Sequence, residues 1–369
     1  MAQPVLDDVG NIKAIDRSKM IDFCVNAPKL YREAAALAEK IQVDYPKPSN
    51  VIVAGMGGSG IGSDLLKDWA KEQAAVPIEV NRDYELPAYA GKKTLVLITS
   101  YSGDTEETLS AFLDALRRKC MVFCVSSGGA LLQNAQRLGV PFVKVPGGMP
   151  PRAALPYMFV PLLVYAEKAG LVIGASQELS EATQLLEKVS RENAPEKPTV
   201  ENYAKALALN IGVTSPVVYG FGFYRGVAMR FKQQFNENSK VPAKWDVFSE
   251  LNHNEIVGWE RADELAKSFS AIFLRDREEP MAIQSRIEIT KELMEQEGVA
   301  QLEIQAQGKS RLARMLSTVL VGDFTSVYLS VLRGVDPTPV KTINYLKDTL
   351  KQNGFREKVL AELSKLKPV

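Results

Sequence analysis

The chain has 369 residues, of which 46% are hydrophobic and 24% are charged, so it can bury the core of one large domain or of two smaller ones. Its 45 basic and 44 acidic residues leave a net charge of +1, which excludes a general electrostatic attraction to nucleic acid or to a membrane surface. Specificity for an anion therefore requires a local site.

Three cysteines, Cys24, Cys120 and Cys124, fit neither a disulfide framework nor a metal-binding spacing. We interpret them as free thiols in a reducing compartment. Residues 1–15 are too polar for a secretory signal, and the longest uncharged apolar stretch, residues 153–166, is too short to span a bilayer. These observations predict a soluble cytoplasmic protein.

The first half of the chain predicts a helical segment followed by an α/β domain. Residues 18–41 have helical periodicity and place an N-terminal helical segment at residues 1–45. Helices are then expected to begin near Ser59, Asp104 and Ala130, and another covers residues 152–169. The strands between them are expected at residues 51–54, 78–81, 95–99, 122–125 and 142–145. This alternation predicts a doubly wound parallel sheet within a first domain at residues 46–170.

The second half repeats this alternation after a polar helical stretch, residues 171–200, in which Pro195 and Pro198 mark the expected domain junction. The expected strands are residues 216–219, 268–274 and 300–304, and the expected helices are residues 224–236, 281–297 and 312–332. Gly220-Phe221-Gly222 follows its strand as Gly55-Met56-Gly57 does, which indicates a duplicated unit at residues 195–333. Bulky Phe221, Phe223 and Tyr224 suggest that this copy has lost its anion site. Residues 334–369 predict one or two C-terminal amphipathic helices.

Two strand-to-helix turns carry the functional signal. They are Gly55-Met56-Gly57-Gly58-Ser59-Gly60 and Ser100-Tyr101-Ser102-Gly103-Asp104-Thr105. Each offers backbone N–H groups, hydroxyls and little steric bulk at a helix start, which is what an anionic phosphate ester requires. We therefore expect a phosphorylated small molecule, bound by Gly57, Gly58, Ser59, Ser100, Ser102 and Thr105.

Two other interpretations of these turns remain open. Gly55-x-Gly57-x-x-Gly60 matches the dinucleotide fingerprint, with Asp83 as the acidic residue that would hold the ribose. The second turn could instead be an ordinary helix N-cap, with Asp104 or Ser102 as the cap and Glu106 and Glu107 in the first turn. In either case these acids must point away from a bound phosphate.

Four further residues are candidates for catalysis, although each has a simpler interpretation as a surface or helix-end side chain. His253 is the one histidine of the chain, which is enough for acid–base work near neutral pH but not for a His-rich zinc site. Glu237 lies near a predicted helix end, where the dipole disfavours an ionised carboxylate and so suits a general base. Arg152 follows two prolines at a helix start, and Lys347 lies on a predicted C-terminal helix.

These motifs together resemble a known family. Residues 55–60, 100–108 (Ser-Tyr-Ser-Gly-Asp-Thr-Glu-Glu-Thr) and 151–156 (Pro-Arg-Ala-Ala-Leu-Pro) resemble the sugar isomerase (SIS) domain proteins. Phe-Asn-Glu-Asn-Ser-Lys at 235–240 and Asn-His-Asn-Glu-Ile at 252–256 are similar to those of the bifunctional phosphoglucose/phosphomannose isomerases. The resemblance runs in order from about residue 50 to Lys347. It implies an α/β fold of two SIS-type, flavodoxin-like doubly wound subdomains with N- and C-terminal helices.

The resemblance also implies roles for the candidate residues. The two turns would hold the phosphate of a hexose 6-phosphate, and Glu237 would move a proton between C1 and C2. His253, contributed by the partner subunit of a homodimer, would open the sugar ring. Arg152 would stabilise the enediolate and Lys347 would assist at the ring oxygen. Where the family often carries a threonine before that lysine, this chain has Val340.

The sequence thus predicts an isomerase that interconverts glucose 6-phosphate and fructose 6-phosphate, and also mannose 6-phosphate, with no metal and no cofactor. Aldose–ketose isomerisation needs an acid–base pair, a proton-shuttling carboxylate and cationic help for the enediolate oxygen, and it removes no electrons from the substrate. The alternatives are a non-catalytic sugar-phosphate-binding regulator on the same fold and a nucleotide-dependent oxidoreductase using residues 55–60.

Overall fold

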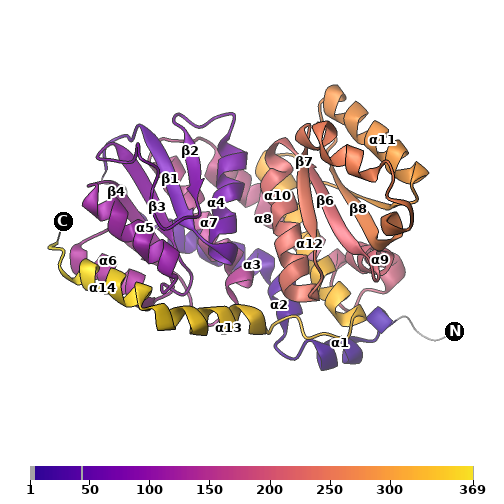
Figure 1. Ribbon diagram of the computed structural model, residues 1–369, viewed down its shortest axis with the longest axis horizontal. Coiled ribbons are helices and arrows are strands. Elements are labelled where there is room, and N and C mark those ends of the chain that lie inside the picture. The colour runs from indigo at the N-terminus through magenta and orange to yellow at the C-terminus, as the bar shows by residue number, and fades with distance from the viewer. Residues whose placement is uncertain (1–4, 43–44, 369) are drawn as a thin grey trace. The chain divides into compact units, whose positions relative to one another are not determined.

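The computed structural model describes residues 5–42 and 45–368 (Figure 1). The parts of the expected terminal helical segments at residues 1–4, 43–44 and 369 lie outside the described residues. The chain divides into two compact units, each assembled from two stretches. Unit 1 comprises Met1–Pro28 and Glu178–Pro339, and unit 2 comprises Lys29–Gln177 and Val340–Val369. The terminal segments are thus shared between the two units.

Unit 2 contains a five-stranded parallel sheet in the order β2-β1-β3-β4-β5. The three inner strands are nearly continuous runs of buried apolar residues, as expected of a parallel sheet covered on both faces. The strands are β1 (Asn50–Gly55), β2 (Ile78–Asn81), β3 (Thr94–Thr99), β4 (Met121–Ser126) and β5 (Phe142–Lys144). All five predicted strands of this domain are present.

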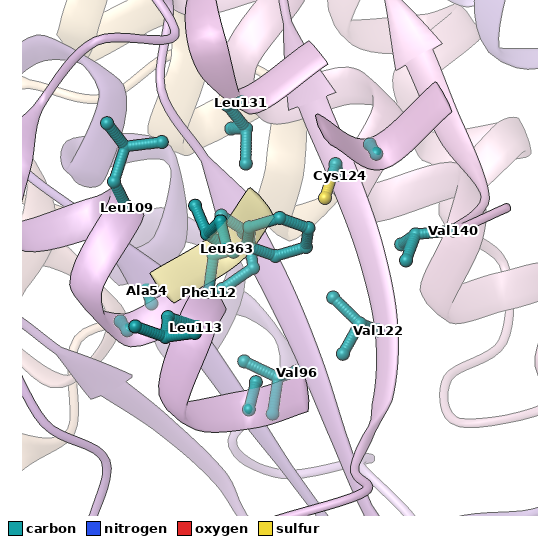
Figure 2. Packing of buried hydrophobic residues seen from close by; sticks show 14 of the residues in the cluster. Ala54, Val96, Leu109, Phe112, Leu113, Val122, Cys124, Leu131, Val140 and Leu363 are labelled. Atoms are coloured by element: carbon teal, nitrogen blue, oxygen red, sulfur yellow. The ribbon is translucent and has the colours of Figure 1, made fainter. Parts of the chain in front are cut away.

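Helices from both stretches of the chain belong to unit 2, among them the last helix, α14. They are α3 (Ala27–Ala38), α4 (Gly57–Ala70), α5 (Glu106–Arg117), α6 (Gly129–Leu138), the 3-10 turn η2 (Pro151–Ala154), α7 (Leu155–Lys168), α13 (Lys341–Leu350), η9 (Lys351–Asn353) and α14 (Phe355–Ser364). Figure 2 shows Leu363 of α14 beside Phe112 of α5, in a cluster with Val96 and Val122 of the sheet. The last helix of the chain therefore belongs to the core of unit 2.

Unit 1 contains a four-stranded parallel sheet in the order β7-β6-β8-β9. The strands are β6 (Ser215–Phe221), β7 (Lys244–Phe248), β8 (Phe269–Arg275) and β9 (Ala300–Gln305). The α-helices are α1 (Val9–Ile15), α2 (Met20–Val25), α8 (Ala175–Glu192), α9 (Tyr203–Ile211), α10 (Arg225–Gln234), α11 (Met281–Gln296) and α12 (Arg311–Leu332). Three of these strands were predicted, and β7 was missed. The expectation of two parallel α/β subdomains is confirmed.

Short turns complete unit 1, and one long helix runs through its core. The turns are η1 (Val5–Asp7), η3 (Thr199–Glu201), η4 (Gly222–Tyr224), η5 (Phe235–Ser239), η6 (Glu250–His253), η7 (Glu255–Trp259) and η8 (Asp263–Ser268), of which η5 is π-helical. Within the described residues, α12 alone is long and apolar enough to cross a membrane, but 89% of its apolar window is buried inside the protein. We therefore regard α12 as a core helix.

Candidate functional site

The two predicted phosphate loops follow neighbouring strands of the unit 2 sheet. β1 and β3 pair in parallel, with Gly55 opposite Thr99, so the turns that follow them start side by side. The chain leaves β1 toward β2 on one side, whereas β3 lies on the other. Ligands of doubly wound sheets bind at this point, where the strand order reverses. The loops therefore lie where the fold favours an anion site.

A direct hydrogen bond joins the two loops. The backbone N–H of Tyr101 donates to Ser59 Oγ over 2.8 Å. Below it, Thr99 Oγ1 donates to the Ser59 carbonyl over 3.0 Å. Ser59 and Tyr101 are only 6% and 4% exposed, so both bonds are shielded from water. The two loops act as one structural element.

The hydroxyls of these loops are held in a way that leaves protons to donate. Ser59 Oγ accepts from Tyr101, and Ser102 Oγ accepts from the Asp104 N–H over 3.2 Å. Ser100 Oγ accepts from the Gly103 N–H and donates to Thr105 Oγ1, both over 3.1 Å. A hydroxyl that accepts in this way keeps its own proton, so Ser59, Ser102 and Thr105 can each donate to an anion. Ser100 is 1% exposed and supports Thr105 from below.

The alternative in which Asp104 or Ser102 caps α5 is contradicted by the structure. Thr105 occupies the N-cap position of α5, and its side chain caps no backbone N–H. The Asp104 carboxylate instead accepts from the Ala130 N–H at 3.2 Å and from Arg356 Nη2 at 2.5 Å. Glu106 accepts from the Tyr84 hydroxyl at 2.6 Å. These acids therefore have partners other than a phosphate, as the sequence required.

Arg152 packs against the first loop. A Cβ atom placed on Gly58 would lie 2.7 Å from the Arg152 backbone nitrogen, so only glycine permits this approach. Arg152 is 3% exposed, at the start of the turn that precedes α7. The Tyr101 hydroxyl also anchors the preceding segment, because it donates to the Pro146 carbonyl at 2.9 Å and accepts from the Met149 N–H at 3.0 Å. The structure thus gathers both loops and Arg152 in unit 2.

Tyr101 is the residue whose importance the sequence did not reveal. Its carbonyl accepts from the Ser127 N–H at 3.0 Å and from Ser127 Oγ at 2.6 Å. Its N–H donates to Ser59 of the first loop, and its hydroxyl bonds Pro146 and Met149 of the segment before Arg152. No local pattern in the sequence shows that Tyr101 joins these three segments.

Glu237 lies in unit 1, in the π-helical turn η5 that follows α10. Such turns are uncommon and occur frequently at functional sites. Lys240 ends the turn in a left-handed conformation, with φ of 55°, and its Nζ donates to the Glu237 carbonyl and to the Pro337 carbonyl. Asn238 and Ser239 fix the turn to Ser326 of α12 at 2.9 and 2.6 Å. The Glu237 backbone is therefore held rigidly.

His253 ends the 3-10 turn η6 of unit 1 and is exposed. Its neighbour Asn252 is tied to α11, since its Nδ2 donates to Thr290 Oγ1 at 2.9 Å. On the other side, Glu255 accepts from the buried Tyr219 hydroxyl. Burial raises the pKa of Glu255 to about 7, and the adjacent Asp246 carboxylate adds to this shift. The segment that carries His253 is thus anchored on both sides.

Lys347 lies on α13, a helix of unit 2 that contains no buried residue. Its side chain is exposed. Across residues 5–42 and 45–368, no group of three or more His, Cys, Asp or Glu side chains could hold a metal ion.

The turn after β6 corresponds to the first phosphate loop. It keeps the backbone conformation of that loop, but side chains of the protein itself fill the place of an anion. Gly222 has φ of 50°, as Gly57 does. The Tyr224 hydroxyl donates to Asp276 Oδ2, and Arg314 Nε pairs with the same oxygen at 3.1 Å. An internal carboxylate therefore occupies the partners that an external anion would need. This arrangement fits the expectation that the second copy has lost its phosphate site.

Two parallel α/β sheets with paired switch-point loops define a protein of the SIS phosphosugar isomerase class. Consistent with this class, the family model described as bacterial phospho-glucose isomerase C-terminal SIS domain matches residues 200–350. In structure, the chain is similar to a glucose-6-phosphate isomerase from Chlamydia trachomatis, with a TM-score of 0.69 at 13% identity, over 92% of this chain and 74% of that one. At that identity the likeness shows the fold alone.

Curated relatives narrow the class to one family. A bifunctional phosphoglucose/phosphomannose isomerase of Caldicellulosiruptor bescii is 40% identical over 90% of this chain and 98% of its own length. A protein of the same name from Aquifex aeolicus is 35% identical over 85% of this chain and 94% of its own. The chain belongs to the bifunctional phosphoglucose/phosphomannose isomerase family.

Proposed function

We propose that this protein is an aldose–ketose isomerase that interconverts glucose 6-phosphate, fructose 6-phosphate and mannose 6-phosphate through an enediol. Family membership supports this activity. The observation that carries it is the loop pair of unit 2, in which the Tyr101–Ser59 hydrogen bond fixes three donor hydroxyls at one sheet edge. Remote binding of a phosphate at such a site orients the reacting carbons.

We assign the phosphate to Ser59, Ser102 and Thr105, to Ser100 acting through Thr105, and to the backbone N–H groups of Gly57 and Gly58. Neutral donors at a helix start suit a dianion, because the dipole of α4 adds to their attraction. Arg152, whose backbone packs against Gly58, is the cation assigned to the enediolate oxygen. Lys347 is assigned to the ring oxygen.

Glu237 is the proposed base that transfers a proton between C1 and C2. Its rigid π-helical turn supports this role, since a catalytic base must be held in position. Replacing Glu237 by Gln is expected to abolish turnover while leaving the fold and phosphate binding intact. Glu292→Gln, which changes an exposed carboxylate on α11 of the same unit, is the matched control and should retain activity.

The direct test of the activity is turnover of fructose 6-phosphate by the purified protein in the presence of a chelator. Glucose 6-phosphate and mannose 6-phosphate are then measured separately. Formation of both supports the proposal. Tight binding of fructose 6-phosphate with no product of either kind would indicate a sugar-phosphate-binding regulator instead.

We further propose a cytoplasmic homodimer in which His253 opens the sugar ring of the partner's substrate. The exposed position of His253 supports delivery to a second subunit, and the free buried thiols of Cys24 and Cys124 suit a reducing compartment. The test mixes Glu237→Gln with His253→Ala under subunit exchange. If the histidine acts across subunits, one intact site per heterodimer restores roughly a quarter of the wild-type activity. No recovery in verified heterodimers would assign His253 to its own subunit.

A further inference from the structure

The C-terminal helix α14 is built into the phosphate-binding unit. Val359 and Leu363 are buried in its core, and Figure 1 shows α14 alongside α5 and α6. Arg137 of α6 donates to the Leu363 and Leu366 carbonyls at 2.7 and 3.0 Å, which satisfies the end of the helix. The position of α14 on this unit is therefore fixed along its length.

The first turn of α14 reaches the second phosphate loop. Arg356 Nη2 donates to Asp104 Oδ1 at 2.5 Å, across 252 positions of sequence. Its neighbour Phe355 packs edge-to-face on Tyr84, with ring centroids 5.0 Å apart, and Tyr84 holds Glu106. Both acids that flank Thr105 are thus engaged, directly or through Tyr84, by the start of α14.

Asp104 transmits this contact to the hydroxyls of the loop. A Cβ atom on Gly129 would lie 2.4 Å from the Ser102 carbonyl and 2.7 Å from Asp104 Oδ2, so the loop is packed tightly against the start of α6. The same Asp104 residue donates its N–H to Ser102 Oγ. A movement of the Asp104 side chain, such as loss of its hold on Arg356 would allow, therefore affects Ser102 and Thr105.

We propose that Arg356 is a positioning residue for phosphate binding, acting through Asp104. It holds the loop in its binding conformation and neutralises a carboxylate that would otherwise repel a phosphate dianion two residues from Ser102. The inference rests on the proposed function, because it assumes that this loop binds the phosphate of the substrate. Arg356 itself is not assigned to touch the substrate.

The experiment compares two ion pairs of the same helix. Arg356→Gln breaks the pair with Asp104. Arg117→Gln breaks the Arg117–Glu362 pair, which joins α14 to the end of α5 at 2.5 Å and lies outside the loop. We expect Arg356→Gln to raise the KM for fructose 6-phosphate and the inhibition constant of inorganic phosphate about three- to tenfold, with kcat little changed. Arg117→Gln should leave all three values unchanged.

Two further variants separate charge from packing. Arg356→Lys keeps the charge and should recover most of the loss. Adding Asp104→Asn to Arg356→Gln removes the uncompensated carboxylate and should also lower KM again. Equal effects of Arg356→Gln and Arg117→Gln, or a fall in kcat with KM unchanged, would overturn the proposal.

Failure of the proposed function would look different. If the wild-type protein does not turn over fructose 6-phosphate, the activity is wrong, but stabilisation by inorganic phosphate still reports on the loop. A smaller thermal shift with phosphate for Arg356→Gln than for Arg117→Gln then supports the positioning role. Equal shifts contradict it.

Discussion

The backbone N–H of Tyr101 donates to Ser59 Oγ over 2.8 Å, and this bond unites two loops that lie 42 residues apart in sequence. Ser59 serves as acceptor in this bond, so its hydroxyl proton stays available for a ligand. One side chain thus joins the two loops and keeps a hydroxyl proton for the phosphate that we propose to bind there. The Tyr101 hydroxyl extends the same connection to the segment before Arg152.

Ser59→Ala is expected to weaken phosphate binding without unfolding the protein. It removes one donor to the phosphate and leaves the buried Tyr101 N–H without its acceptor, a loss of about 1–2 kcal/mol or roughly five- to thirtyfold in KM. Steady-state kinetics with fructose 6-phosphate measure this change in KM. Ser63→Ala is the control, because Ser63 is fully buried one turn further along α4 and its hydroxyl has no hydrogen-bond partner within the described residues. An equal KM for the two variants would contradict the role of Ser59.

Tyr101→Phe tests the connection to Arg152. It deletes the hydroxyl that bridges the Pro146 carbonyl and the Met149 N–H, and a lost buried hydrogen bond costs about 1–3 kcal/mol of unfolding free energy. Because the segment before Arg152 loosens, kcat should fall more than KM rises. Tyr328→Phe is the control: its buried hydroxyl donates to the Asn193 carbonyl at 2.6 Å in unit 1, whereas both loops belong to unit 2. This control should lose stability but keep kcat, as measured by urea denaturation and steady-state kinetics.

The sheet of unit 2 was predictable because its inner strands are fully buried on both faces and appear in the sequence as apolar runs. β7 was missed for the opposite reason. Its sequence Lys-Trp-Asp-Val-Phe lies at a sheet edge, and only Phe248 is buried, so it has no apolar run. The expected helix at residues 224–236 likewise gave no sign that it changes to a π-helical turn at Phe235.

The two turns could be located from the sequence because glycines and hydroxyls cluster at the ends of β1 and β3, which is a local signal. Their binding of a phosphate stays a prediction. The role of Asp104 could not be predicted, because its partner Arg356 lies 252 residues away. Local signals allowed Asp104 or Ser102 to be a helix cap, whereas in the structure the Asp104 carboxylate accepts from the Ala130 N–H and from Arg356. Long-range ion pairs leave no pattern in a single sequence, so this part of the site required the structure.

Leu363→Ala tests how much α14 contributes to unit 2. Leu363 is fully buried in the cluster of Figure 2, and truncating such a leucine costs about 2–5 kcal/mol through lost burial and the cavity left behind. Thermal and urea denaturation should show this loss. Leu346→Ala on α13 is the control, since Leu346 is 56% exposed and should change stability by less than about 0.5 kcal/mol. A loss confined to fraying of α14, with the rest of the transition unchanged, would contradict the core role.

Glu255 makes the stability of unit 1 depend on pH. Burial, with a contribution from Asp246, raises its pKa from 4.5 to about 7, so the folded protein retains a proton that the unfolded chain has released. The folded state binds more protons between these two values, and stability therefore falls as pH rises from about 4.5 through about 7. Glu255→Gln stays neutral at every pH and preserves an acceptor for the Tyr219 hydroxyl. It should be more stable than the wild type at pH 8, by about 1–3 kcal/mol, and equal to it near pH 4.5.

Urea denaturation at a series of pH values from 4.5 to 8 measures this difference. Glu292→Gln provides the matched control, because it removes an exposed carboxylate on α11 of the same unit and should follow the wild-type curve. Because the Glu255 segment carries His253, loss of the proton should also loosen that turn. A Glu255→Gln curve parallel to the wild type at all pH values would show that folding does not raise the pKa of Glu255.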